Sequence, residues 1–231
     1  MKSISMLFLV ICVLLSLSAA QSAPARTDVY HVHFTKAALG KAAQLGDYLK
    51  TPDPNAAMPE HRIVLRHQDG EDWDYVVIQH LGTKATVDAA GNPPPAAARD
   101  LSAWHGDTFV AGPAWPEFTR ALGLGDQVGK TAGSVYVVAV QRAAPGHRDQ
   151  LEKILSEPPG AGDPVAGVVL MVHLEGGPWQ YLTITRYNSW QDFASSETNS
   201  VAKTNKGTGG WFEFRDHVAY HNDTLTDRIA P

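Results

Sequence analysis

The stretch that decides the fold is a hairpin signature that occurs twice, as His67-x-x-Gly70-x-x-Trp73-x-Tyr75-x-x-Ile78 and as His173-x-x-Gly176-x-x-Trp179-x-Tyr181-x-x-Ile184. It belongs to a longer block, because residues 29–78 align with residues 135–184 at a constant offset of 106 without a gap. Fifteen of the fifty aligned positions are identical. Self-similarity of this kind indicates a repeated structural unit. The sequence therefore predicts two copies of one fold unit in a single chain.

A shorter match closes each copy. Residues 103–109 read Ala-Trp-His-Gly-Asp-Thr-Phe and residues 219–225 read Ala-Tyr-His-Asn-Asp-Thr-Leu, now at an offset of 116. Before this segment, the spacing of apolar residues predicts strand, helix, strand and strand in each copy. The expected strands are Val29–Phe34, Arg62–His67, Trp73–His80, Val135–Gln141, Ala166–Leu174 and Trp179–Arg186, and the expected helices are Lys36–Leu49 and Gly146–Ser156. The helix Lys36–Leu49 should bury Leu39 and Leu45. The pattern leaves open whether the closing segments are strands or helices.

The first twenty residues have the form of a secretory signal peptide. Lys2 is followed by the apolar run 6–15 and by the small residues Ser18-Ala19-Ala20. A basic start, a short apolar run and a small-residue cleavage site are typical of export signals. We therefore expect a periplasmic or secreted protein with a signal peptide at 1–20, a first repeat at 28–112, a linker at 113–133 and a second repeat at 134–231.

Composition narrows the classes of partner and chemistry. Cys12 is the only cysteine, so cleavage of the leader would leave no thiol for a disulfide or a nucleophile. The formal net charge is −5 and there is no basic stripe, which argues against nucleic acid as a partner. After signal cleavage we expect no membrane association. The oligomeric state stays open.

The order β-α-β-β, a variable region and a closing element resembles a ferredoxin-like β-α-β-β-α-β domain. Two such copies in one chain are similar to the dimeric α/β-barrel superfamily with both protomers fused. Members of that superfamily include the antibiotic-biosynthesis monooxygenases, the stress-responsive A/B barrels and the NIPSNAP-like proteins. The resemblance covers residues 29 to about 229 and implies an α+β fold with two ferredoxin-like repeats packed as a pseudo-dimeric barrel. It transfers no catalytic motif, because fold does not imply function.

The closing segments offer candidate catalytic residues: His105, Asp107, His221 and Asp223. A carboxylate two residues from an imidazole can orient the ring or raise its pKa. In a strand the two side chains would point the same way, whereas in a helix they would diverge. The alternative is structural, with Asp bonding the backbone and His packing at the sheet edge.

Two further patterns have a structural and a functional interpretation. His217 and His221 have the spacing of two metal ligands on one helical face, but no third clear ligand accompanies them, so we predict no metal site. Trp73 and Trp179 are candidates for a ligand-stacking platform. The alternative is that they fill the core beneath each hairpin.

The first copy carries polar residues where the second has apolar ones. His31, His33, Arg62 and Arg66 correspond to Val137, Ala139, Val168 and Val172. If these faces look into the space between the sheets, the barrel has a basic wall suited to a small apolar or amphipathic ligand. If they face solvent, they form no pocket.

The leading functional hypothesis is an exported small-molecule-binding protein with its pocket between the repeats. One alternative is a cofactor-independent or haem-linked monooxygenase-like enzyme, and another is a non-catalytic interaction scaffold. Neither the cofactor nor the ligand follows from the sequence.

Overall fold

The computed structural model describes residues 25–83, 99–125, 131–175 and 177–231. The predicted signal peptide at 1–20 lies outside these residues.

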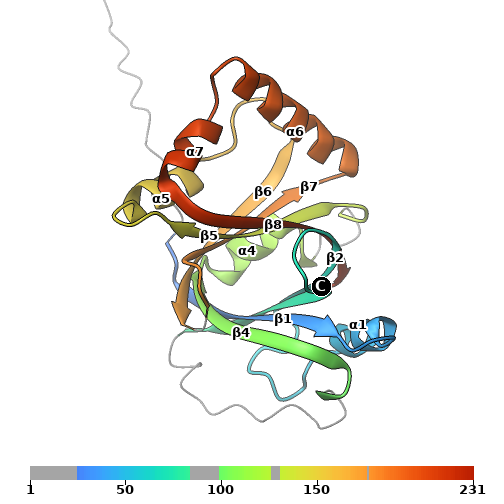
Figure 1. The fold of residues 1–231 in the computed structure, drawn as a ribbon. Helices are drawn as coiled ribbons and strands as arrows, with labels where there is room; N and C mark the ends of the chain where they lie inside the picture. Colours follow the sequence, from blue (N-terminus) through green and yellow to red (C-terminus); the bar gives the residue numbers. More distant parts are fainter. Residues whose placement is uncertain (1–24, 84–98, 126–130, 176) are drawn as a thin grey trace, which may run out of the picture.

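Eight antiparallel strands form a closed barrel in the order β1-β3-β2-β8-β5-β7-β6-β4 (Figure 1). The strands are β1 (Asp28–Ala37), β2 (Arg62–Asp69), β3 (Tyr75–Gly82), β4 (Ser102–Gly112), β5 (Val135–Ala143), β6 (Val165–Glu175), β7 (Tyr181–Tyr187) and β8 (Val218–Ala230). The described helices are α1 (Ala42–Lys50), α4 (Trp115–Leu122), α5 (Arg148–Leu155), α6 (Trp190–Asn205) and α7 (Trp211–His217). The α+β class follows the prediction.

Each half of the chain contributes four neighbouring strands in the same order, β4-β1-β3-β2 from the first and β8-β5-β7-β6 from the second. The strand register repeats as well, since His33 lies opposite Asp107 and Ala139 lies opposite Asp223. The barrel closes where β2 pairs with β8 and β4 pairs with β6. Residues 84–98, which correspond in position to α6, lie outside the described residues.

The interior of the barrel is filled by alternate side chains of the strands. Tyr30 and Val32 of β1 and Tyr136 and Val138 of β5 are all buried in one hydrophobic cluster. This cluster also takes Ile63, Leu65, Val76, Ile78, Val110, Val169, Met171, Leu182 and Ile184 from the other strands. The duplicated apolar positions therefore meet at the centre of the molecule.

The segment predicted as a linker, residues 113–133, contains helix α4, which lies within the ring of strands in Figure 1. Phe118 and Leu122 of α4 are completely buried and belong to the same hydrophobic cluster as the barrel strands. The helix approaches β6 so closely that a Cβ at Gly167 would lie 2.0 Å from the carbonyl oxygen of Ala121. Helix α4 thus closes one end of the barrel.

One residue from each copy fixes an end of α4. The carboxylate of Asp28 accepts a hydrogen bond from the backbone N–H of Trp115 (3.1 Å) and pairs with His80 Nε2 (2.7 Å). At the other end, the guanidinium of Arg186 donates to the carbonyl of Ala121 (2.9 Å). His80 also stacks on the ring of Trp115 at 5.3 Å, and it occupies the position equivalent to Arg186, so strands β3 and β7 contact opposite ends of the helix.

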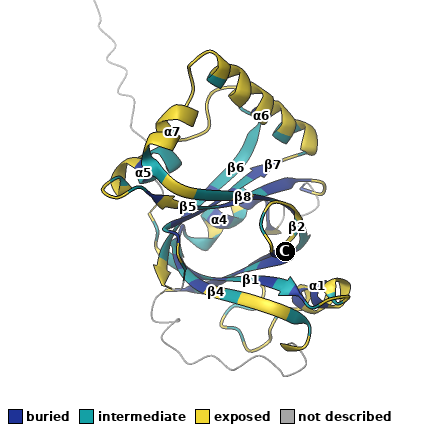
Figure 2. Cartoon of the chain, in the orientation of Figure 1, coloured by how far each residue is buried: buried dark blue, intermediate teal, exposed yellow. Residues whose placement is uncertain are grey.

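The remaining helices lie outside the barrel, where α6 and α7 are largely exposed (Figure 2). Helix α1 packs Leu45 and Leu49 against Val64 and Tyr75, and α5 packs Leu151 against Tyr181. Among the described residues no helix is both long and apolar enough to cross a membrane.

The expected strands appear within a few residues of their predicted bounds, but the first helix is shorter than predicted. Strand β1 keeps pairing with β4 as far as Ala37, and Gly40 has a left-handed conformation with φ of 75°. Helix α1 therefore starts at Ala42, and Leu39 lies outside it, fully exposed. The prediction that Leu39 is buried in this helix was wrong. The closing segments, left open by the sequence, are strands β4 and β8.

Candidate functional site

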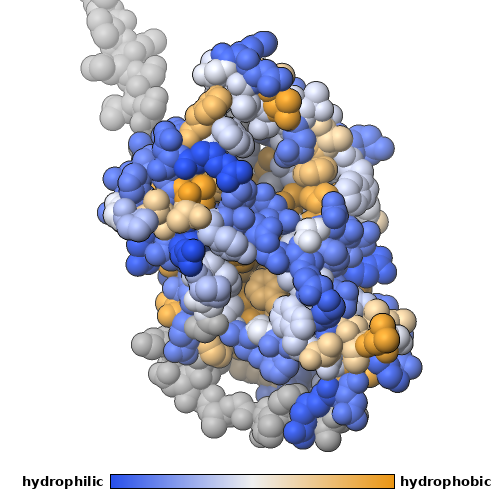
Figure 3. Space-filling view, viewed as in Figure 1, coloured by the Kyte–Doolittle hydropathy of each residue, from blue (hydrophilic) through white to orange (hydrophobic). Residues whose placement is uncertain are grey.

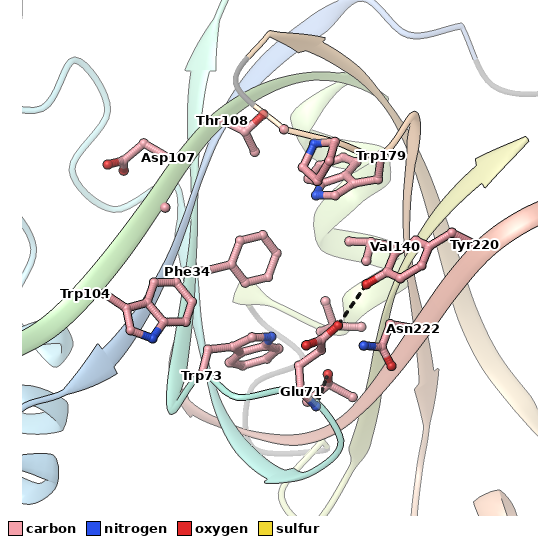
Figure 4. A pocket seen from close by; sticks show the side chains of 15 residues that line it. Phe34, Glu71, Trp73, Trp104, Asp107, Thr108, Val140, Trp179, Tyr220 and Asn222 are labelled. Atoms are coloured by element: carbon pink, nitrogen blue, oxygen red, sulfur yellow. Dashed lines mark hydrogen bonds between the residues drawn. The ribbon is translucent and has the colours of Figure 1, made fainter.

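A pocket of about 300 Å³ opens into the barrel at the end away from α4, with residues of both halves in its wall (Figure 4). The space-filling view, which has the orientation of Figure 1, shows a hollow near the centre of this face, with apolar colour inside a mostly polar rim (Figure 3). Its lining includes Phe34, Glu71, Trp73, Trp104, Thr108, Val140, Trp179, Tyr220, Asn222 and Thr224.

Most of the lining residues occur as equivalent pairs of the two copies. Trp73 corresponds to Trp179, Phe34 to Val140, Trp104 to Tyr220 and Thr108 to Thr224. The pocket is therefore lined by related side chains of both halves of the chain. The lining departs from this symmetry at its polar groups, because the positions equivalent to Glu71 and Asn222 are Gly177 and Gly106.

The apolar part of the wall is aromatic. Trp73 and Trp179 are 6% and 7% exposed and belong to the central hydrophobic cluster. The ring of Phe34 lies 5.4 Å from that of Trp73. Trp104 and Tyr220 are partly exposed, so they form the rim of the mouth. The pocket offers several flat apolar surfaces within reach of one small ligand.

The polar part of the wall is centred on one carboxylate. The Tyr220 hydroxyl donates a hydrogen bond to Oε1 of Glu71 (3.1 Å), drawn in Figure 4. The backbone N–H of Glu71 donates to the hydroxyl of Thr224 (3.3 Å). Burial and this carboxylate raise the pKa of Tyr220, so the tyrosine remains a neutral donor. Glu71 keeps a second carboxylate oxygen for another hydrogen-bond donor.

The duplicated histidines of the hairpins lie behind the tryptophans. His173 Nε2 accepts a hydrogen bond from the backbone N–H of Gly177 (2.8 Å), and its ring lies 4.9 Å from that of Trp179. His67 packs 5.8 Å from Trp73, and within the described part of the chain its buried Nε2 has no hydrogen-bond partner. Among the described residues, the histidine of the second copy is therefore hydrogen-bonded to its hairpin turn, whereas the Nε2 of the first is not.

The hypothesis of a basic wall inside the barrel was wrong. His31 and His33 lie on the outer face of β1, because the inner face is taken by the apolar side chains of Tyr30, Val32 and Phe34. Both rings instead contact Asp107 on β4, at 2.8 Å each.

The two arginines of that hypothesis also lie outside the barrel. Arg62 is buried between β2 and the end of α1, where it donates hydrogen bonds to the carbonyls of Leu49 and Lys50. Arg66 is exposed and forms a two-pronged ion pair with Asp227 (3.0 and 2.8 Å). Both therefore have structural partners.

The candidate catalytic residues of the closing strands face away from the pocket. His105 and Asp107 share one outer strand face and meet at 2.7 Å, as the strand interpretation predicted. In Figure 4 the carboxylate of Asp107 points away from the cavity that its backbone lines. In the second copy His221 Nε2 and Asp223 Oδ2 are 3.9 Å apart.

His217 and His221 do not share a helical face, because α7 ends at His217 and β8 begins at Val218. His217 instead contacts His147 (2.7 Å), and His221 contacts Arg215 (3.2 Å). The helical spacing weighed for a metal site is thus not realised.

Of the predicted ligand-binding residues, the structure places only Trp73 and Trp179 in the pocket. The pocket also contains four residues that were not predicted, the aromatic Phe34, Trp104 and Tyr220 and the acid Glu71. A signal for Trp104 and Tyr220 was available, because each precedes the His of a His-x-Asp segment and must face the other way in a strand. Glu71 lies in the hairpin turn, where alternation does not apply.

No protein-family model matches the chain, and no curated protein matches it either. Solved structures do. A candidate monooxygenase from Fusobacterium nucleatum aligns with a TM-score of 0.60 at 7% identity, over 88% of this chain and 93% of its own. An anthrone oxidase-like protein aligns with a TM-score of 0.54 at 15% identity, over 90% and 97%. A candidate monooxygenase from Lactobacillus acidophilus aligns with a TM-score of 0.52 at 10% identity, over 87% and 94%. At these identities the likeness concerns the fold alone: this chain shares the overall fold of these three structures.

Proposed function

We propose that the chain binds a small aromatic molecule inside the barrel. The observation that carries this proposal is the pocket of about 300 Å³ walled by Trp73, Trp179 and Phe34. Its size is at the lower end of the range for ligand sites, and an apolar lining with few polar groups is typical of them. A flat ring system would stack on the walls and displace water from them.

Glu71 gives this pocket a preference for a ligand that carries a hydroxyl group. The Tyr220 hydroxyl donates a hydrogen bond to one oxygen of the carboxylate, and the other oxygen can accept a hydrogen bond from a hydroxyl group of the ligand. Hydrogen bonds to an ionised partner contribute about 1.5–3 kcal/mol, which is a factor of roughly ten or more in affinity. Because Gly177 stands at the equivalent place of the second copy, the ligand should bind in one orientation.

Calorimetric titration with 1-naphthol and with naphthalene tests both statements. We expect the wild-type chain to bind both, and 1-naphthol more tightly. Glu71→Gln should weaken 1-naphthol by roughly tenfold and leave naphthalene nearly unchanged. Val140→Phe should abolish binding of both, because the larger side chain would fill part of the pocket, as Phe34 does at the equivalent position.

The matched control is Val201→Phe, the same substitution at an exposed position of helix α6. It should bind both compounds as the wild type does. If Val140→Phe binds as well as the control, the ligand site lies elsewhere and the proposal fails.

A second candidate function is oxidation of such a ligand by molecular oxygen without a bound cofactor. Its support is the shared fold with monooxygenase-like proteins and an anthrone oxidase-like protein, together with a carboxylate beside an aromatic cavity. Glu71 would act as the base that removes a proton from an acidic ring carbon. Oxygen then takes up the electrons, so that a ring CH₂ and O₂ become a ketone and water.

An oxygen electrode with dithranol, a hydroxylated anthrone, tests this second candidate. We expect oxygen uptake above the spontaneous rate, and a loss of about 10²–10⁴-fold of the enzymatic rate in Glu71→Gln. Binding of 1-naphthol without any oxygen uptake would leave the barrel as a binding protein and exclude oxidation of this substrate.

We further propose that the two halves are fused ferredoxin-like repeats. The equal strand orders β4-β1-β3-β2 and β8-β5-β7-β6 support this arrangement. If it holds, the two halves expressed separately should be insoluble or should associate with each other, and two well-behaved monomers would refute it.

A further inference from the structure

Three imidazoles converge on one carboxylate on the outer face of β1 and β4. Asp107 Oδ1 lies 2.8 Å from both His31 Nε2 and His33 Nδ1, and Asp107 Oδ2 lies 2.7 Å from His105 Nδ1. All four side chains are partly accessible, with exposures between 24% and 58%. The group is open to ions from solvent on a side of the barrel that does not face the pocket.

The strand register brings these residues together. His33 lies directly opposite Asp107 in the β1–β4 pair, so their Cβ atoms are neighbours across the ladder. His31 is two residues from His33 on β1, and His105 is two residues from Asp107 on β4. All four side chains therefore lie on the same face. Four chemically active side chains, up to 76 residues apart in the sequence, are therefore fixed on two rigid strands.

The second copy shows that this gathering is not required by the fold. Val137 and Ala139 replace the two histidines of β1 at the equivalent places of β5. His221 and Asp223 remain, but Arg215 contacts the imidazole of His221 at 3.2 Å. The same strand pair is thus stable with apolar residues, and only the first copy carries the cluster.

Asp107 is held as an anion by its neighbours. Its burial alone would raise the pKa, but the hydrogen bonds from His31 and His33 outweigh burial and hold the pKa well below its ordinary value. Its hydrogen-bond partners among the described residues are three imidazoles rather than a lysine or an arginine. A neutral imidazole can bind a metal ion, whereas the protonated side chains of lysine and arginine cannot.

We propose that His33, His105 and Asp107, with His31 as a fourth ligand, bind one divalent transition-metal ion of the zinc type. The ligand atoms of the first three lie within 4.8 Å of one another. In a tetrahedral zinc site with bonds of about 2.0–2.2 Å, ligand atoms are roughly 3.3 Å apart, so small side-chain rotations close the site. Imidazole nitrogens with one carboxylate suit zinc, copper or nickel rather than calcium or magnesium.

Besides these small rotations, metal binding changes the proton positions of the rings. His31 Nε2, His33 Nδ1 and His105 Nδ1, which face Asp107, would each give a lone pair to the ion, and the N–H would move to the other ring nitrogen. The ion would link β1 to β4 across their ladder. Because the carboxylate of Asp107 points away from the cavity, this site is independent of the proposed ligand pocket (Figure 4).

The test uses the full chain without a histidine tag, freed of metal with a chelator. Calorimetric titration with Zn²⁺ should show one bound equivalent, and Co²⁺ should give the visible absorption of a four-coordinate site with nitrogen ligands. His33→Ala and Asp107→Asn should each weaken Zn²⁺ binding by at least about tenfold. His33→Ala installs the residue that the second copy carries at this place, so the barrel should fold as before.

His221→Ala is the matched control, because it removes the equivalent histidine of the second copy and should bind Zn²⁺ like the wild type. Zinc should also raise the melting temperature of the wild type and of His221→Ala, but not that of His33→Ala. The proposal is overturned if no stoichiometric Zn²⁺ binding is found. It is equally overturned if His33→Ala and Asp107→Asn bind as tightly as the control.

Discussion

Trp73 and Trp179 each belong to two parts of the molecule at once. Both are more than nine-tenths buried and pack in the cluster that fills the barrel. Both also form walls of the pocket, so one edge of each ring is covered by protein and another faces the cavity. The sequence presented core and ligand platform as alternatives for these rings, whereas the geometry is compatible with both roles.

Replacement of either buried tryptophan should destabilise the protein strongly. Trp73→Ala and Trp179→Ala should each lower the free energy of unfolding by about 3–5 kcal/mol, because they leave a cavity in the central cluster. Trp211→Ala should lower it by less than about 1 kcal/mol, since that ring is 45% exposed and packs on Arg215 and on the exposed Phe212. Chemical denaturation measures all three. A loss below about 1 kcal/mol at position 73 or 179 would show that these rings do not support the core.

At the scale of elements, helix α4 depends on one position of β6 that has no side chain. A Cβ at Gly167 would overlap the carbonyl oxygen of Ala121, near the end of the helix. The same carbonyl accepts a hydrogen bond from Arg186, so the helix cannot move away without losing that contact. The fit of α4 in the barrel therefore rests on a backbone approach.

Gly167→Ala should displace α4 and lower the free energy of unfolding by about 1–3 kcal/mol. Gly160→Ala is the control, because a Cβ there meets no atom within 4 Å, and it should change stability by no more than about 0.5 kcal/mol. Thermal or urea unfolding of both variants checks this. Equal stability of the two would mean that α4 is held less tightly than its contacts indicate.

For the whole molecule, the duplication was the feature that the sequence revealed best. Two equal blocks predicted two equal sheets, and the strand orders of the halves are indeed equal. The face of β1 was predicted less well. In that strand the apolar side chains of Tyr30 and Val32 point inward. The equivalent strand β5 is largely apolar on both faces, so alternation in β5 does not show which face of either strand points into the barrel.

What the sequence could not supply was long-range proximity. Asp107 lies beside His31 only because β1 and β4 pair with one particular register, and Glu71 reaches Tyr220 only because the barrel closes. Helix α4 was hidden for another reason, since its short amphipathic pattern lies between Pro113 and several glycines that indicate a loop.

The pocket is lined by both halves of one chain, so its two sets of lining residues need not be identical. If two identical chains closed around the same cavity, every substitution would appear twice, and an acid at position 71 would bring two carboxylates into about 300 Å³. Like charges at such short range resist ionisation together, and one of them would be driven to its protonated form. Joining both copies in one polypeptide removes that constraint. The two halves can then differ in their polar groups, as they do here, where the position equivalent to Glu71 is Gly177.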